Sequence, residues 1–353
     1  MTRKLALFVF VFAISPALLL ACGNDVSSKV IEPAPTAVVD PSAPGPDAVG
    51  STQLTFERTS STTGGPRNLD TIVWYPATDG TGNPDESLAA VRDAEPARDD
   101  SPLPIIVWSH GAGGSFPYAP VYFAPHLASY GFVVIAPSHP GNLHPDCVTV
   151  TGCTAEGMAD SYVNRPEDLT FALDSMLKLN DDPDSAFYRL LDGGRVGISG
   201  HSFGGTDTVR ASTTAAGAPF RAALAMAPCV DGVVPSADEV TMPLTMMGGD
   251  RDKRCPSADQ QTYFDAIDPG LPSFLLVFPR GGHSAYGDEC PAPVAELACG
   301  PNDLSQDEAH QFINFYATAF FETYVAGDQR YAAFLDPFVN SEEQDIRYTA
   351  HLP

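Results

Sequence analysis

A serine in a glycine-flanked pentapeptide is the strongest sign of chemistry in this sequence. The pentapeptide GHSFG at residues 200–204 fits the pattern G-x-S-x-G and follows a β-rich run at residues 195–198. A helical stretch begins directly after the serine, at Phe203. So tight a strand-to-helix turn needs glycine on both sides, and it lifts the hydroxyl above the sheet edge at a helix N-terminus. Ser202 is therefore the predicted nucleophile.

A histidine must accompany this serine, because a hydroxyl is a poor nucleophile until a base takes its proton. After Ser202 the chain offers His283, His310 and the terminal His351. His283 follows an apolar strand within the run RGGHS, so a loop can bring its ring back to the serine. His310 falls inside an expected helix, where its role is fixed by packing. We expect His283 to be the base.

Two aspartates compete to be the carboxylate that orients this base. Asp250 and Asp252 both follow the apolar run at residues 244–247. Asp252 is preferred because it fits a G-x-x-D turn counted from Gly249. Asp250 is expected to form the turn through hydrogen bonds to local backbone. The sequence alone leaves the choice between the two open.

The oxyanion of an acyl-transfer intermediate needs two backbone N–H groups aimed at it in advance. The first is expected from Phe203, after the nucleophile. The second is expected from the glycine-rich loop HGAGG at residues 110–114, with Ala112 as the donor and His110 holding the loop. The predicted reaction is acyl transfer to water, with no cofactor and no metal.

The elements that would position these residues alternate between short β-rich runs and helical patterns. This alternation is typical of an α/β fold with a mostly parallel sheet and helices on both faces. About eight strands are expected, near residues 54–59, 71–75, 105–108, 132–136, 195–198, 222–226, 244–247 and 274–278. Helices are expected at residues 166–180 and after a capping box formed by Ser305 and Glu308. Only residues 227–242 separate the sixth and seventh strands, so no large cap domain is expected.

Charge and composition limit the function classes. The chain of 353 residues has 19 Lys and Arg against 44 Asp and Glu, a formal net charge of -25. Such a surface repels phosphate backbones, so nucleic-acid binding is disfavoured. Hydrophobic residues make up 44%, which is enough for a packed core. We expect one catalytic domain at residues 51–353, acting as a monomer.

The first 50 residues are expected to form a signal peptide and a tether that lie outside the catalytic domain. Arg3 and Lys4 precede an apolar run at residues 5–20, and the tetrapeptide LLAC that ends at Cys22 resembles the lipobox of bacterial lipoproteins. The resemblance implies a signal peptide at residues 1–21, lipidation of Cys22 and attachment to the cell envelope. By the same resemblance, the glycine after Cys22 implies the outer membrane if the source is Gram-negative. A Pro-rich tether is expected at residues 22–50.

Export would place the other six cysteines in an oxidising compartment, where they pair by default. Proximity along the chain favours Cys147 with Cys153 and Cys290 with Cys299. This leaves Cys229 with Cys255, the least certain pair. A zinc site is disfavoured because no C-x-x-C pair occurs.

Several motifs together resemble a known family. The motifs are WSHGAG at residues 108–113, SYGF at 129–132, RPED at 165–168 and GHSFGG at 200–205. They resemble bacterial relatives of platelet-activating-factor acetylhydrolase, often labelled predicted dienelactone hydrolases. The turn GDRD at residues 249–252, together with GHS at 282–284, is similar to bacterial cutinases and polyester hydrolases. Both resemblances imply the α/β-hydrolase fold and a serine esterase.

The expected activity is hydrolysis of short-chain or exposed carboxylic esters, carried by a small molecule, a lipid or a polymer. A peptidase or a lipase of the same fold stays open, because a catalytic triad does not by itself distinguish these substrates. The alternative outside the enzymes is a catalytically idle binding protein on the cell surface. All the catalytic positions are filled, which argues against it.

Overall fold

The computed structural model describes residues 38–80, 82–98, 101–144, 146–147, 153–213, 219–288, 304–336 and 346–352. Cys22, Cys290 and Cys299 lie outside these residues, as do the expected signal peptide and most of the expected tether. Among the described helices, none is both long and apolar enough to cross a membrane.

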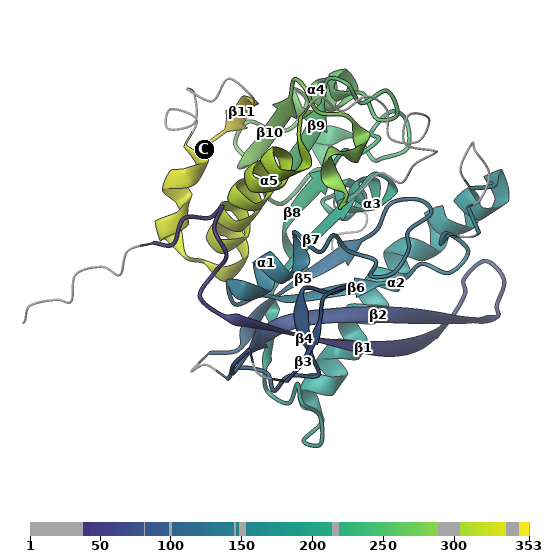
Figure 1. Ribbon diagram of the computed structural model, residues 1–353. Coiled ribbons are helices and arrows are strands. Elements are labelled where there is room, and N and C mark those ends of the chain that lie inside the picture. Colours follow the sequence, from purple (N-terminus) through teal and green to yellow (C-terminus); the bar gives the residue numbers. More distant parts are fainter. Residues whose placement is uncertain are drawn as a thin grey trace, which may run out of the picture. The chain divides into compact units, whose positions relative to one another are not determined.

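A single eleven-stranded sheet forms the centre of the described chain (Figure 1). Its order is β11-β10-β9-β8-β7-β5-β6-β2-β1-β4-β3. The strands are β1 (Ala48–Thr59), β2 (Pro66–Ala77), β3 (Asn83–Asp85), β4 (Ala90–Arg92), β5 (Leu103–Ser109), β6 (Val133–Pro137), β7 (Leu191–His201), β8 (Phe220–Met226), β9 (Leu244–Gly249), β10 (Ser273–Phe278) and β11 (Arg347–His351). The six central strands from β6 to β10 run parallel, so their carboxyl ends share one edge.

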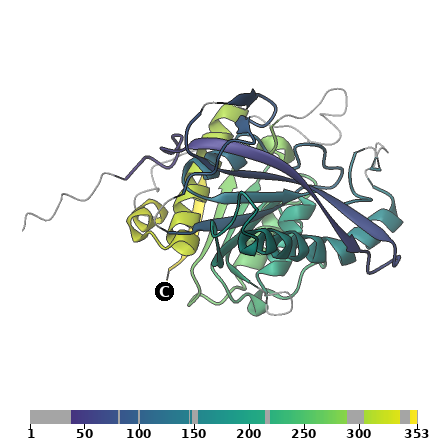
Figure 2. The same cartoon turned by 90° about the horizontal axis from the view of Figure 1, so that it is seen from below.

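Helices cover both faces of the sheet (Figure 2). The helices are α1 (Ala124–Ser129), α2 (Ala155–Asp181), α3 (Phe203–Ala211), α4 (Ser257–Phe264) and α5 (Gln306–Phe321). Helices α1 and α5 pack in one hydrophobic cluster, and α2, α3 and α4 pack in the other. Every residue of the inner strands β5, β6, β9 and β10 is buried, as expected of strands with helices on both sides.

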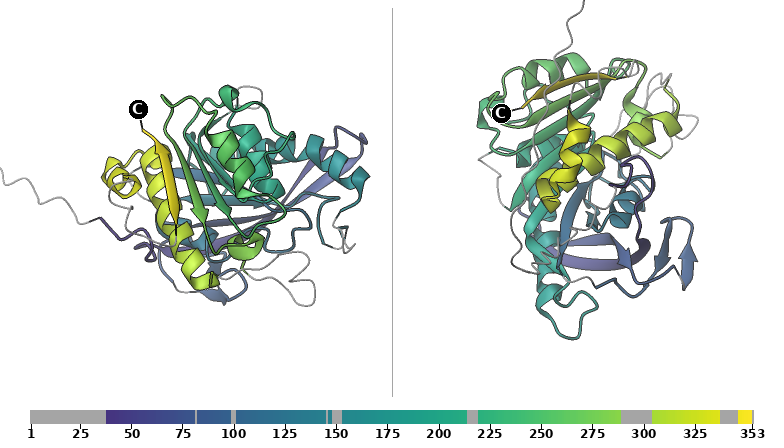
Figure 3. Two further views of the ribbon diagram at one scale, coloured as in Figure 1. Left: turned by 90° about the horizontal axis from the view of Figure 1, so that it is seen from above. Right: turned by 90° about the vertical axis from the view of Figure 1, so that its left-hand side faces the viewer.

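All eight expected strands are present, and the predicted α/β-hydrolase type of sheet is confirmed. Three short strands were not expected: β3 and β4 have three residues each, too few for a visible period. The third, β11, has the polar sequence RYTAH and pairs with β10 at the sheet edge (Figure 3). The predicted capping box at Ser305 and Glu308 opens α5.

Helix α2 begins eleven residues before the predicted start at Pro166. Proline has no N–H, so the carbonyl of Tyr162, four residues earlier, loses its helical partner. Arg210 of α3 replaces it, because its Nη1 donates to this carbonyl at 2.9 Å. Its guanidinium also stacks 3.8 Å from the centre of the Tyr162 ring. A contact between helices therefore carries α2 through its proline.

The tether predicted for residues 22–50 is too long at its C-terminal end. Strand β1 already begins at Ala48, and the residues before it are bound to the body. The amide of Gly45 donates to Ser129 Oγ at 2.8 Å, and Tyr130 donates to the Asp40 carbonyl at 2.7 Å. These hydrogen bonds to α1 and the residue after it make residues 40–50 part of the folded unit.

Candidate active site

Ser202 lies at a sharp turn between β7 and α3. Its φ of 57° and ψ of -117° place it in a region that residues with side chains rarely adopt. The turn is held by its amide, which donates to the carbonyl of Met226 at 2.9 Å. A Cβ on Gly204 would overlap the carbonyl of Ser109, so only glycine fits there. The predicted tight strand-to-helix turn around Ser202 is present.

Three side chains from three strand ends meet at this turn. His283 follows β10 and lies 2.9 Å from Ser202, measured from Nε2 to Oγ. Its Nδ1 lies 2.7 Å from Oδ2 of Asp252, which follows β9. Only 4 to 7% of each residue is exposed. The sequence-predicted serine, base and preferred acid thus form one hydrogen-bonded chain at the carboxyl edge of the sheet.

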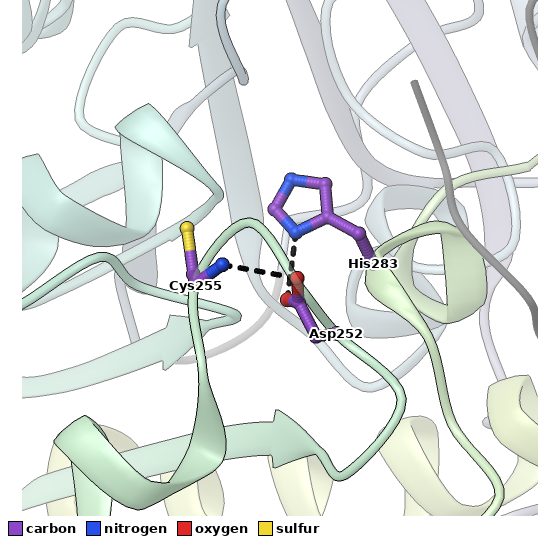
Figure 4. Close-up of side chains that lie close together, drawn as sticks. All are labelled: Asp252, Cys255 and His283. Atoms are coloured by element: carbon purple, nitrogen blue, oxygen red, sulfur yellow. Dashed lines mark hydrogen bonds and ion pairs between the residues drawn. The ribbon is translucent and has the colours of Figure 1, made fainter. Parts of the chain in front are cut away.

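The backbone after β9 holds Asp252 in place. Its other oxygen, Oδ1, accepts from the amides of Arg254 at 2.8 Å and Cys255 at 3.0 Å. Figure 4 shows the carboxylate between the His283 ring and the Cys255 amide. Burial raises the pKa of Asp252, but the hydrogen bonds from His283 and these amides outweigh it and leave the pKa below its ordinary value. Asp252 is therefore ionised at neutral pH.

Asp250, the alternative acid, is bound elsewhere. It accepts from Ser257 Oγ at 2.8 Å and forms an ion pair with Arg347 of β11. The other two histidines that could have served as the base also have separate partners. His310 Nε2 lies 3.0 Å from the carbonyl of Gly287, and His351 Nδ1 lies 3.1 Å from Ser273 Oγ.

The loop after β5 carries Ala112 next to the serine. Ala112 and Phe203 line the same cavity as Ser202. The loop is fixed from behind, since the amide of His139 donates to Nε2 of His110 at 3.0 Å and the amide of Gly113 donates to the Asn142 carbonyl at 3.1 Å. The structure therefore places both predicted oxyanion residues beside the nucleophile.

A fully buried arginine, for which no role was predicted, connects these parts. Arg165 of α2 donates from Nε to Asp207 of α3 at 2.7 Å and from Nη1 to Asn142 at 2.8 Å. Its Nη2 donates to the carbonyl of His110 in the loop after β5. Its guanidinium also lies 4.5 Å from the centre of the Phe203 ring. Arg165 thus contacts the loop after β5 and helix α3 together.

Burial shifts the pKa values within this ion pair. It lowers the pKa of Arg165 and raises that of Asp207, while the attraction between the two charges opposes both shifts. The one feature of the sequence that pointed to Arg165 was the RPED motif at residues 165–168, and this motif was used only as evidence of a family resemblance. Asp207, the partner, lies 42 residues along the chain and belongs to no motif.

One cavity is lined by Ser202, and a second is lined by His201, the residue before it. The first has a volume of about 520 Å³ and a mostly apolar wall, formed by Ala112, Cys153, Met158, Ala159, Tyr162, Ser202, Phe203, Thr206, Cys229, Val233 and Arg254. The second, of about 450 Å³, is lined by the segment from Gly114 to Pro120 and by His201, Tyr286 and Gly287.

Two of the three predicted disulfides fall within the described chain. Cys147 is bonded to Cys153, and Cys229 is bonded to Cys255. The ligand atoms of Asp252, Cys255 and His283 lie within 4.8 Å of one another, the spacing of a metal site. The sulfur of Cys255 is bonded to Cys229, however, so it is not available as a thiolate ligand.

Comparisons with known proteins agree with this geometry. The PET hydrolase-like family matches residues 120–286, a little under half of the chain. Cutinase est1 from Thermobifida alba is 26% identical over 212 residues, which cover 60% of this chain and 57% of the cutinase. The chain thus matches little more than half the length of that relative. A solved ferulic acid esterase from Streptomyces cinnamoneus has a TM-score of 0.66 at 21% identity, covering 87% of this chain and 98% of that chain.

The comparisons confirm the similarity to cutinases that was predicted from the acid turn and the histidine loop. The resemblance to platelet-activating-factor acetylhydrolases stays a prediction. The chain therefore has the α/β-hydrolase fold and is similar in sequence to ester hydrolases of the cutinase type.

Proposed function

We propose that this chain is a serine hydrolase that cleaves carboxylic esters through an acyl-enzyme on Ser202. The observation that carries the proposal is the continuous line of hydrogen bonds from Ser202 Oγ through His283 to Asp252. The names of the related proteins, a cutinase and a PET hydrolase-like family, favour an ester over an amide as substrate.

The geometry supports a two-step reaction. Nε2 of His283 takes the proton from Ser202 as Oγ attacks the ester carbonyl, and the amides of Ala112 and Phe203 receive the oxyanion. The imidazolium, stabilised by Asp252, then protonates the departing alcohol. Water attacks the acyl-enzyme by the same route and releases the acid, which restores Ser202.

The test uses a fluorophosphonate, which reacts with activated serines. We expect rapid labelling of the wild type and none of Ser202→Ala. An unlabelled wild-type protein would contradict the proposal and favour a binding protein. A panel of matched esters and amides then separates esterase from peptidase, and faster turnover of the amides would favour a peptidase.

The substrate class that the surface favours is an exposed or polymeric ester. Several large hydrophobic side chains of the described chain are exposed. Four of them, each 39 to 45% exposed, are Phe116, Tyr162, Val163 and Val233. Phe116 lines the second cavity, and Tyr162 and Val233 line the first. An apolar rim around an open site fits attachment to an apolar solid or to a lipid surface. Within this chemistry, a lipid ester of the acetylhydrolase type is the alternative to a polyester.

The rim can be tested with a matched pair of variants. Phe116→Ser should lower the rate on a suspended polyester more than the rate on a soluble ester, because it removes apolar contact area outside the reacting centre. Leu352→Ser removes a residue that is similarly exposed, at 49%, but lines neither cavity. Equal losses for the two variants on polymer would contradict a role for the rim.

We also propose that the protein is exported and anchored by a lipid on Cys22. The disulfides Cys147–Cys153 and Cys229–Cys255 fit an oxidising compartment. Metabolic labelling with a fatty acid should mark the wild type, whereas Cys22→Ala should be unlabelled and released from the membrane fraction.

A further inference from the structure

Arg254 is the one charged residue among the described residues that line the first cavity, which Ser202 also lines. The rest of the wall consists of apolar side chains, two half-cystines and the hydroxyl groups of Tyr162, Ser202 and Thr206. Arg254 is exposed, and within the described chain its guanidinium forms no hydrogen bond or ion pair. Asp231 and Asp259 share a smaller neighbouring cavity with it but do not pair with it. The cavity therefore presents an unpaired cation to whatever fills it.

The backbone of Arg254 is fixed relative to the reacting centre. Its amide donates to Oδ1 of Asp252 at 2.8 Å, so the residue is held at the acid turn. Its charge also acts on the site: burial and His283 lower the pKa of His201 to about 3, and Arg254 contributes in the same direction. His201 precedes the nucleophile in the chain. Arg254 and Ser202 line the same cavity, so a substrate bound there can contact both residues.

The two cavities can be assigned to the two halves of an ester. The base returns its proton to the leaving alcohol, so the alcohol lies toward His283. The residues that follow His283 line the second cavity, where Tyr286 and Gly287 lie. Ala112 and Phe203, the proposed oxyanion donors, line the first cavity. If the alcohol half occupies the second cavity, the first cavity, which holds Arg254, receives the acyl half.

We propose, building on the esterase function above, that this cavity takes acyl groups that end in a carboxylate. The substrates would be monoesters of dicarboxylic acids, with the methylene chain against the apolar wall and the free carboxylate paired with Arg254. The net charge of -25 repels anions overall, so selectivity for them requires a local cation. Water cleaves the remaining ester bond and yields the dicarboxylate and the alcohol.

Such monoesters arise when one of the two ester bonds of a dicarboxylic diester has been hydrolysed. An ester hydrolase that cuts the diester or a polyester must therefore supply this substrate. The site would then act on the fragments of a first cleavage as well as on intact esters.

The test compares ethyl esters with matched acyl chains. Monoethyl esters of succinate, glutarate and adipate are paired with the neutral ethyl esters of equal chain length, and kcat/KM is measured for each. The ratio of the anionic to the neutral ester is the readout. In Arg254→Gln we expect this ratio to fall about fivefold, the size of one exposed charge-assisted pair, through KM. Arg254→Lys should keep part of the ratio, and added salt should reduce the wild-type ratio.

Lys253→Gln is the matched control, because Lys253 is the adjacent exposed cation but lines only the smaller neighbouring cavity. An equal fall of the ratio in both variants would overturn the proposal in favour of a general field effect. A preference for acetate esters with the carboxylate on the alcohol side would also overturn it. If neither neutral nor anionic esters are turned over, the esterase function itself fails. If neutral esters are turned over and Arg254→Gln leaves the ratio unchanged, only this inference fails.

Discussion

Asp250 and Asp252 are separated by one residue at the end of β9, and their surroundings give them different chemistry. Asp252 is buried, accepts two amides and contacts His283. Asp250 faces outward and pairs with Arg347 of the edge strand β11. A carboxylate acts on the imidazole tautomer only when it touches the ring, so the two aspartates are not interchangeable.

We therefore expect Asp252→Asn to lower kcat by roughly a thousandfold or more, because the amide neither fixes the tautomer nor stabilises the imidazolium. Asp250→Asn removes an exposed ion pair and should change kcat less than threefold. Steady-state kinetics on one soluble ester decides between them. A larger loss in Asp250→Asn would reverse the assignment of the acid.

Glu322, at the end of α5, makes stability depend on pH. It is 7% exposed, and burial together with Asp328 raises its pKa to about 8. The folded state therefore keeps this proton to higher pH than the unfolded state does. Stability should fall as pH rises from about 4.5 to 8 and then level off, by a few kcal/mol at about 1.4 kcal/mol per pKa unit.

Glu322→Gln should remove this pH dependence, because an isosteric neutral amide replaces the titrating group. Urea unfolding at several pH values gives the measurement. The variant and the wild type should be nearly equal in stability at pH 5, and the variant should be the more stable at pH 8. Parallel curves over this range would show that Glu322 does not titrate in the folded protein.

At the scale of elements, the pair of Arg165 and Asp207 joins α2 to α3 and both to the oxyanion loop. Removing Arg165 leaves Asp207 fully buried, with the more distant Arg210, at 3.6 Å, as its remaining ionic partner. Arg165→Met should therefore cost about 3–5 kcal/mol of stability. The double variant with Asp207→Leu should recover much of this loss, since no unpaired charge remains.

The same double variant should still have kcat lowered by roughly tenfold to a hundredfold, because the His110 carbonyl and the loop that carries Ala112 lose their anchor. KM should change little. Recovery of kcat together with stability would show that Arg165 acts only on folding. Arg165→Lys, which keeps the charge but not the fork of donors, should lie between the two.

The disulfides tie elements at the walls of the larger cavity. Cys229 follows β8 and Cys255 follows β9, 26 positions later in the sequence, so losing this bond should cost about 3 kcal/mol. The Cys147–Cys153 bond closes only six residues, and its loss should cost about 2 kcal/mol. Thermal unfolding of the two double serine variants compares them. Mass mapping should find Cys290 joined to Cys299 as the third pair.

At the scale of the whole molecule, the site lacks a covering segment between β8 and β9. These seventeen residues, 227–243, contain only one short 3-10 helix (Ala237–Glu239). The connection is pinned instead, since Tyr162 of α2 donates to the carbonyl of Val233 at 2.9 Å. An open site buries little of a long acyl chain, so each added methylene gains less than the roughly 0.8 kcal/mol of full burial.

Activity on soluble nitrophenyl esters should therefore peak between acetate and butyrate. No jump should occur when the substrate passes its micelle concentration, because the described connection between β8 and β9 forms no lid that has to open. A maximum at long chains or a sharp rise at the interface would instead indicate a lipase.

The sequence by itself determined the features that depend on neighbouring residues. The elbow around Ser202, the eight main strands, the capping box of α5 and the histidine that follows β10 all follow from turn chemistry and local periodicity. The cysteine pairs within the described chain followed from spacing once export was assumed.

The tertiary structure decided whatever depends on partners far apart in the chain. The roles of Asp250 and Asp252 are distinguished by Arg347, which pairs with Asp250 and lies 97 residues beyond it in the sequence. Helix α2 continues through Pro166 because Arg210 supplies the missing donor. The Arg165 network joins α2, α3 and the loop after β5, and the cavity that holds Arg254 likewise combines distant segments. No local pattern encodes such contacts, because each arises only when the parallel sheet brings its carboxyl ends to one edge.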